Sequence, residues 1–173
     1  VLQITTDASG LAETDAVLQA GTYLIKELTA PEGYLLSEET LTFSIPEDQP
    51  GEMVDLTATP VKDSVIRGGF ALSKWDLERN EAGKTQGDAV LEGAEFTLSN
   101  ESEGAVYVNG RKIAAGEIID TFKTNAEGKI ETSETLLPYG TYKLEETCPP
   151  PGYTREGENL TRIFQIRENR KIC

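Results

Sequence analysis

The chain has 173 residues, and its 30 acidic against 16 basic side chains give a formal net charge of −14. This charge argues against nucleic acid as a partner, because phosphate binding depends on Lys and Arg side chains that release counterions. The sequence contains no His, which is the usual general base and a common metal ligand. It also contains neither a phosphate-binding glycine loop nor a run of about 20 apolar residues that would span a membrane, so we expect no enzyme, metal, cofactor or membrane-spanning segment.

The first recognisable element is a segment that occurs twice. Gly21-Thr-Tyr-Leu-Ile-Lys-Glu-Leu-Thr-Ala-Pro-Glu-Gly-Tyr34 returns, 119 residues later, as Gly140-Thr-Tyr-Lys-Leu-Glu-Glu-Thr-Cys-Pro-Pro-Pro-Gly-Tyr153. We call this segment the box. A period that long indicates tandem domains rather than a solenoid. A glycine turn before the box and a strand after it are repeated as well: Thr6–Gly10 with Thr124–Gly128, and Leu41–Ile45 with Arg162–Ile166.

The repeat period divides the chain into two domains, residues 1–60 and residues 61–173. The first unit lacks a counterpart of residues 65–117, so we expect it to be truncated and to hold only the C-terminal half of a domain. A half-unit of about 60 residues buries too little surface to be stable alone. We therefore expect it to be incomplete, or completed by chain outside this sequence.

A last strand for the first domain is predicted at Val54-Asp-Leu-Thr-Ala-Thr-Pro60. Its period of two places Val54, Leu56 and Ala58 on one face and Asp55 on the other. Pro60 ends the strand because it has no amide donor. The boundary between the domains is expected between Thr59 and Gly69.

Two strands of the second domain carry an ionisable side chain in phase with their apolar face. In Gly69–Asp76, Lys74 alternates with Phe70 and Leu72. In the second box, Glu146 alternates with Tyr142 and Leu144 in the same way. Buried charges are rare unless they are paired, so one interpretation is a structural ion pair, or a strand end where the lysine reaches water. The other interpretation is a reactive pair.

Five motifs in order resemble the collagen-adhesin B-type domain, the SpaA-like, prealbumin-like module of Gram-positive pilins and adhesins. They are Phe70-x-Leu72-x-Lys74-x-Asp76, Leu91-Glu-Gly-Ala-Glu-Phe96, Leu137-Pro-Tyr-Gly-Thr-Tyr-x-x-x-Glu146, Pro151-Gly-Tyr153 and Phe164-x-Ile166. The resemblance implies an all-β protein with two tandem prealbumin-like, inverse immunoglobulin-like β-sandwich domains. The second of these domains would lack its last strand.

The resemblance also implies an intramolecular isopeptide bond. Its donor would be Lys74, its proton shuttle Glu146, and its acceptor an Asn or Asp on the last strand. A lysine amine attacks a carbonyl only when neutral, and burial generally favours that form. Folding supplies the proximity, which is equivalent to an effective molarity of about 10⁵ M or more.

The acceptor is where this sequence departs from the family pattern. In the second domain the acceptor strand is expected beyond residue 173, and Asn169 lies at the expected turn, which makes it a poor candidate. In the first domain the acceptor position falls on Ala58, which has no carboxyl or amide. We therefore expect no bond there and an inactive Glu27, the first-box counterpart of Glu146.

Two cysteines, Cys148 and Cys173, are the only ones in the chain. In an oxidising extracellular setting they would be able to form a disulfide. The alternative is two unpaired thiols, and neither has a neighbouring base that would make it a catalytic nucleophile.

The resemblance implies a non-enzymatic stalk or spacer segment of an adhesin or pilin anchored to a Gram-positive cell wall, outside the cell. Its partners would be neighbouring domains of the same surface protein. One alternative is an adhesive module that binds a host matrix protein or glycan. Another is the accessory domain of a secreted hydrolase.

Overall fold

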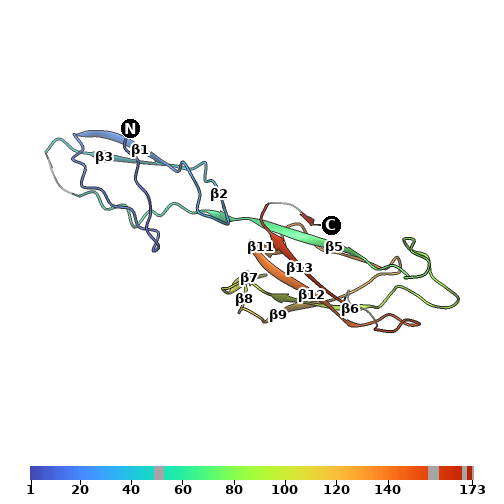
Figure 1. Cartoon of the computed structure of the whole chain (residues 1–173). Helices are drawn as coiled ribbons and strands as arrows, with labels where there is room; N and C mark the ends of the chain where they lie inside the picture. Colours follow the sequence, from blue (N-terminus) through green and yellow to red (C-terminus); the bar gives the residue numbers. More distant parts are fainter. Residues whose placement is uncertain (49–52, 156–159, 169–170, 173) are drawn as a thin grey trace. The chain divides into compact units, whose positions relative to one another are not determined.

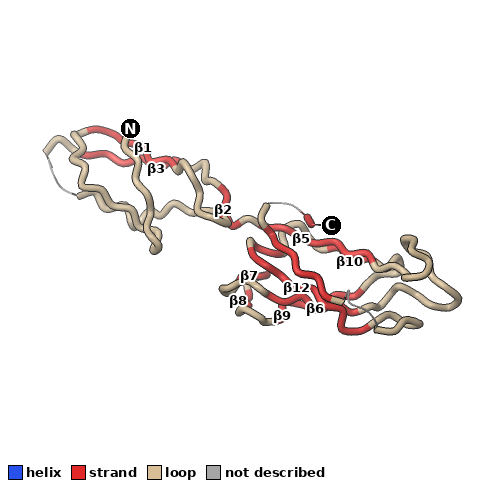
Figure 2. The backbone as a smooth tube through the Cα atoms, in the orientation of Figure 1, coloured by secondary structure: helices blue, strands red, loops and turns tan. Residues whose placement is uncertain are grey.

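The computed structural model describes residues 1–48, 53–155, 160–168 and 171–172. Throughout these ranges the only regular structure is β-strand (Figure 2), so the all-β class is confirmed. Contacts group the chain into two compact units (Figure 1). The first comprises Val1–Ala30 and Leu36–Asp63, and the second comprises Pro31–Leu35 and Ser64–Cys173. The division at residue 60 stays a prediction.

The first unit is built on one hairpin. Strand β1 (Gly21–Lys26) pairs antiparallel with β3 (Thr40–Ile45), so that Gly21 lies opposite Ile45. The rings of Tyr23 and Phe43, which are partners in this register, stack with centroids 5.4 Å apart. These two side chains are only half-buried, and the buried hydrophobic side chains of the described chain all lie between Phe70 and Ile166. The hydrophobic core therefore belongs to the second unit.

The last strand predicted for the first unit is absent. Residues 54–60 form no strand and turn at 57–59, where Asp55 accepts a hydrogen bond from the Thr57 amide at 2.9 Å. The Thr59 amide donates to the Leu56 carbonyl, also at 2.9 Å. The prediction was wrong because alternation selects a face but supplies no neighbouring strand, and here short polar side chains bond the local backbone.

The second unit is a sandwich of two sheets. One sheet has the order β13-β12-β6-β9 and is antiparallel throughout. The other has the order β10-β5-β11, with β14 also paired to β5. The bounds are β5 Arg67–Ser73, β6 Glu95–Asn100, β9 Ile118–Lys123, β10 Lys129–Glu131, β11 Leu137–Pro138, β12 Gly140–Cys148, β13 Thr161–Ile166 and β14 Lys171–Ile172.

Two short ribbons complete the second unit. Strand β2 (Tyr34–Leu35), from the end of the first box, pairs with β4 (Ser64–Val65). Strand β7 (Val106–Val108) pairs with β8 (Arg111–Ile113). The end of the first box therefore belongs by its contacts to the second unit.

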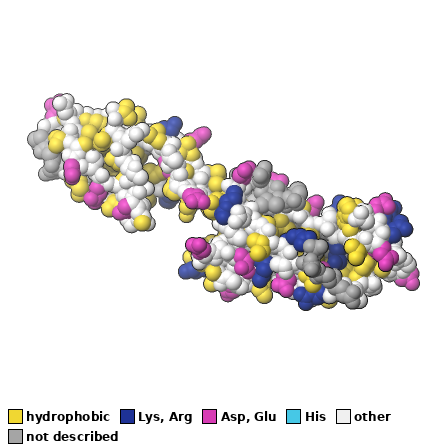
Figure 3. Space-filling model, in the orientation of Figure 1, with side chains coloured by type: hydrophobic (Ala, Val, Ile, Leu, Met, Phe, Trp, Pro, Cys, Tyr) yellow, Lys and Arg dark blue, Asp and Glu magenta, His cyan; other side chains and the backbone are white. Residues whose placement is uncertain are grey.

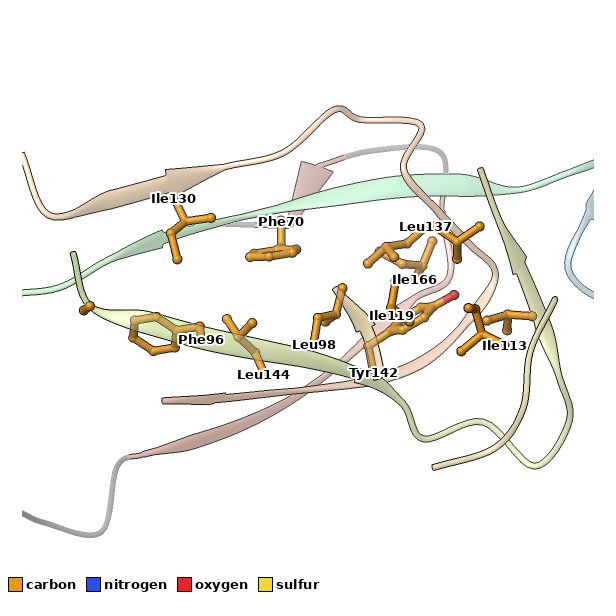
Figure 4. Packing of buried hydrophobic residues seen from close by; sticks show 13 residues of the cluster. Phe70, Phe96, Leu98, Ile113, Ile119, Ile130, Leu137, Tyr142, Leu144 and Ile166 are labelled. Atoms are coloured by element: carbon orange, nitrogen blue, oxygen red, sulfur yellow. The ribbon is translucent and has the colours of Figure 1, made fainter. Parts of the chain in front are cut away.

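The core fills the space between the two sheets. Figure 4 shows Phe70 and Leu137 of one sheet facing Leu98 and Tyr142 of the other. Tyr142 is fully buried, and its hydroxyl donates to the Pro138 carbonyl at 2.8 Å. Burial raises the pKa of this phenol well above its usual range. The core cluster comprises Phe70, Ala94, Phe96, Leu98, Val106, Val108, Ile113, Ile119, Ile130, Leu137, Tyr142, Leu144 and Ile166.

Strand β14 runs parallel to β5, with Lys171 opposite Gly69 and Ile172 opposite Phe70. We expected the final strand of the second domain to lie entirely beyond residue 173, but the structure shows its first paired residues.

Position 69 must be glycine, because a Cβ there would lie 2.2 Å from the carbonyl oxygen of Ser133.

Candidate functional site

The candidate site joins the two sheets at one end of the second unit. Lys74 directly follows β5, and Glu146 lies near the end of β12. As predicted, alternation turns both side chains inward. Lys74 lies on the same face as the buried Phe70, and Glu146 lies on the same face as the buried Tyr142 and Leu144. Lys74 and Glu146 therefore approach each other from strands that belong to different sheets.

The two side chains form an ion pair. Nζ of Lys74 lies 2.8 Å from Oε1 and 3.0 Å from Oε2 of Glu146. The Glu146 side chain is 6% exposed and that of Lys74 is 21% exposed. The carboxylate is thus nearly removed from water and depends on the ammonium group for its compensation. Both interpretations made from the sequence, a structural pair and a reactive pair, require this proximity.

Main-chain hydrogen bonds hold both members of the pair in place. The Lys74 amide donates to the Gly128 carbonyl and the Glu146 amide to the Leu160 carbonyl, each at 2.8 Å. Gly128 has φ +72°, and a Cβ there would lie 2.9 Å from the Lys74 carbonyl oxygen. The glycine turn repeated in the sequence therefore permits the close approach that fixes the end of β5.

Asp76 and Tyr153 form a second link between the same segments. The Tyr153 hydroxyl donates to Oδ2 of Asp76 at 2.8 Å, while Oδ1 of Asp76 accepts the amides of Glu78 and Arg79, both at 2.9 Å. Asp76 is 3% exposed. These hydrogen bonds hold the pKa of Asp76 below its usual value, and the bond from the Arg79 amide has the largest effect. Burial, and secondly the bond to Asp76, raises the pKa of Tyr153 to about 12.

Asp76 and Tyr153 belong to separate sequence motifs, and nothing within those motifs connects them. The only available signal was their position, since Asp76 follows Lys74 by two residues and Tyr153 closes the box that contains Glu146. A separation of 77 residues between the two partners gives no local pattern to recognise.

Glu27 has different surroundings from its counterpart Glu146. Its Oε2 accepts the Ser37 amide at 2.7 Å. Burial and the nearby Glu27 carboxylate raise the pKa of Asp63, and Oδ1 of Asp63 has no hydrogen-bond partner among the described residues. A second carboxyl group therefore lies beside the first-box glutamate, where the second box has an amine. Ala58 lies exposed in the turn described above.

Some of the predicted positions fall outside the described residues. They include Asn169 and Cys173. The pairing of Cys173 with Cys148 therefore stays a prediction. The Cys148 thiol is exposed and lies 3.6 Å from the carbonyl oxygen of Pro149. Within the described ranges no group of acidic or Cys side chains could hold a metal ion.

The surface of the second unit is polar and carries paired charges. Lys123 pairs with Glu95 at 2.7 Å, and Lys143 pairs with Glu101 at 3.2 Å. Acidic side chains are scattered over the visible face of the molecule (Figure 3). A search of the described residues finds no helix suited to crossing a membrane.

Comparison with known proteins places these observations in a family. The family described as SpaA, prealbumin-like fold domain, matches residues 1–60 and 80–172. The fold class predicted from the sequence is thus confirmed. A search of the curated proteins finds no match.

Several solved structures are similar to the chain. The TIE protein of Bacillus anthracis is 29% identical, with a TM-score of 0.64 over 98% of this chain and 26% of its own. A streptococcal ancillary pilin is 20% identical, with a TM-score of 0.41 over 90% of this chain and 44% of its own. A mutant of the shaft pilin SpaA from Lactobacillus rhamnosus GG is 19% identical, with a TM-score of 0.39 over 99% of this chain and 72% of its own. The chain thus spans about a quarter of the TIE protein and under half of the ancillary pilin.

Proposed function

Because the chain belongs to the family of SpaA prealbumin-like fold domains, we propose that it is a load-bearing segment of a bacterial surface protein. It acts as a stalk or spacer outside the cell and is anchored through the protein that carries it. Its partners are the neighbouring domains of that protein. The Lys74–Glu146 pair carries the proposal, since it joins the end of β5 to β12, the box strand in the opposite sheet.

The strand directions of the second unit suit a segment under tension. Because β14 runs parallel to β5, a chain continuing along β14 leaves the unit at the end opposite to the one where β5 enters. Pulling on both ends then shears the β5–β14 pairing and loads its hydrogen bonds together. A covalent bond between these two strands would carry the force past all the residues between them.

We further propose that Lys74 forms such a bond, with Glu146 as the proton shuttle. A proton passes from the Lys74 ammonium group to the Glu146 carboxylate, and the neutral amine attacks the side-chain carbonyl carbon of an Asn or Asp. The protonated carboxyl group of Glu146 polarises that carbonyl, gives its proton to the leaving group and takes up the second proton of the attacking amine. A C–N amide bond forms, and one ammonia leaves from Asn, or one water from Asp.

The register of β14 supports a position for the proposed acceptor. Ile172 lies opposite Phe70, and Lys74 follows Phe70 by four residues. A strand continuing in the same register therefore brings the fourth residue after Ile172 opposite Lys74. Adjacent parallel strands lie about 4.8 Å apart, which a lysine side chain spans.

The first unit, by contrast, is proposed to form no such bond. Glu27 is held by the Ser37 amide, and Asp63, beside it, contributes a second carboxyl group but no amine. The role of the first unit in this proposal is structural.

Intact mass of a chain extended through the strand that β14 opens tests the chemistry. We expect the wild type to be lighter by one ammonia or one water, and the Lys74→Ala and Glu146→Ala variants to keep their full mass. Lys143→Ala, which removes a lysine from the surface pair with Glu101, is the matched control and should lose mass as the wild type does. A wild type at full mass would contradict the bond.

Force spectroscopy on the same extended chain tests the mechanical role. In the wild type the proposed bond should keep residues 75–172 from extending under load. In Lys74→Ala the end-to-end length should increase by the full length of that segment when the unit unfolds. Equal extension of both would refute a load-bearing bond. Binding of the chain to a host matrix protein or glycan would instead favour the adhesive alternative.

A further inference from the structure

The Asp76–Tyr153 hydrogen bond lies close in sequence to the candidate reactive pair on both sides. Asp76 follows Lys74 by two residues and Tyr153 follows Glu146 by seven. The strands that precede them, β5 and β12, belong to different sheets. The Lys74–Glu146 pair and the Asp76–Tyr153 bond thus both bridge the two sheets at the same end.

The segments that carry Asp76 and Tyr153 are themselves tightly held. Asp76 accepts the amides of Glu78 and Arg79, which folds the chain after β5 into a turn. Across from this turn, Pro150 is fully buried. The Pro151 carbonyl accepts the Val90 amide at 3.3 Å. The hydroxyl bond therefore connects two ordered segments rather than two mobile loops.

Close packing against Ala89 holds the segment that carries Tyr153. Gly152 has φ +88°, and a Cβ there would lie 2.9 Å from the Cβ of Ala89. The Tyr153 amide donates to the Pro150 carbonyl at 3.2 Å, which closes the turn that presents the hydroxyl. In the second box, the Pro-x-Gly-Tyr ending thus presents the Tyr153 hydroxyl to Asp76.

We propose that Asp76 and Tyr153 are positioning residues that hold Lys74 and Glu146 at reacting distance and restrict the access of water to the Lys74 amine. This inference rests on the proposed function, because it concerns the same pair. The amine must pass its proton to Glu146 before it attacks, and a looser site holds Nζ less closely against the Glu146 carboxylate. Misplacement of reacting groups by about 1 Å can cost about a hundred-fold in rate.

Amine acetylation of the present chain tests the positioning without any acceptor. Limiting acetic anhydride labels lysines according to exposure, and peptide mass spectrometry reads each site. We expect Lys74 to be acetylated about ten-fold faster in Tyr153→Phe than in the wild type, the change expected when a hydrogen bond to a charged group is lost. Lys143, whose side chain is 34% exposed, is the internal reference and should not change.

Two further variants make this test specific. Asp76→Asn removes the charge but keeps an acceptor oxygen, so its effect on Lys74 should be smaller than that of Tyr153→Phe. Tyr107→Phe removes the hydroxyl of a tyrosine that is 57% exposed and should match the wild type. Unchanged labelling of Lys74 in Tyr153→Phe, or equal acceleration at Lys74 and Lys143, would overturn the positioning role.

The extended chain then separates this inference from the isopeptide proposal. If the bond forms, Tyr153→Phe should slow the mass loss about ten- to a hundred-fold, while Tyr107→Phe forms it at the wild-type rate. Mass loss at the wild-type rate in Tyr153→Phe would overturn the inference alone. A wild type that never loses mass overturns the isopeptide proposal, and the acetylation result still decides whether the bond positions Lys74.

Discussion

Removing one partner of the Lys74–Glu146 pair should have very different effects on stability depending on which partner is removed. Lys74→Met leaves a carboxylate in a site that is 6% exposed. Glu146→Gln leaves an ammonium group on a side chain that is 21% exposed and flexible enough to turn toward water. The burial of the remaining charge, rather than the loss of the contact, sets the difference.

The magnitudes follow from the burial of each partner. Breaking a buried ion pair by removing one partner costs about 3–5 kcal/mol, and the part-exposed Lys74 places Lys74→Met at the lower end, about 3 kcal/mol. Glu146→Gln should cost about 1 kcal/mol, the range of a lost hydrogen bond. The double variant should be more stable than Lys74→Met alone, because no buried charge remains.

Urea unfolding of the present chain measures these differences. Trp75 is the only tryptophan and lies in the second unit beside Lys74, so its fluorescence reports this unit. Lys143→Met, from a pair in which both side chains are 34% exposed, is the control and should cost about 0–1 kcal/mol. A larger loss in Glu146→Gln than in Lys74→Met, or a double variant no better than Lys74→Met, would refute the reasoning.

Three other predictions concern the framework of the second unit. Asp76 has a lowered pKa, so its contribution to stability is present above its unfolded value and is lost as pH falls through its folded value. Tyr153 has a pKa raised to about 12, so its contribution is lost as pH rises from about 10 to about 12. Urea midpoints across pH should therefore fall at both ends, and Asp76→Asn should flatten the acid side; an unchanged acid side would contradict this. Gly69→Ala should destabilise the unit by about 3 kcal/mol because the new Cβ would meet the Ser133 carbonyl. Its control is Gly104→Ala, where a Cβ would have nothing within 4 Å and the loss should be under about 1 kcal/mol. Thermal melts compare the two variants, and equal melting temperatures would show that the backbone around residue 69 relaxes. Asn100 is fully buried, donates to the carbonyls of Gly104 and Ile113, and accepts a hydrogen bond from the Ser102 amide. Asn100→Ala should therefore lower stability by about 2–3 kcal/mol in the same melts. Almost no loss of stability would show that those groups find other partners.

The inward faces of β5 and β12 were predictable because alternation is a local property. The residues in phase with Phe70 and with Tyr142 turn inward, and this alone placed Lys74 and Glu146 on the core side of their strands. Strands β1 and β12 each begin at the first glycine of their copy of the box. The same local rule failed at residues 54–60, where alternation was present but no neighbouring strand was available to accept the main-chain hydrogen bonds.

The sequence by itself determined the repeat, which is read from residue order alone, and the all-β class through its ordered motifs. It also determined that Lys74 and Glu146 face inward, because alternation depends on residues close together in the chain. Only the tertiary structure decided which inward groups meet. It paired Lys74 with Glu146 across two sheets, linked Asp76 to Tyr153 over 77 residues, and set a carboxyl group beside Glu27. Such pairings depend on how the sheets pack, and packing is set by the whole core rather than by any single strand.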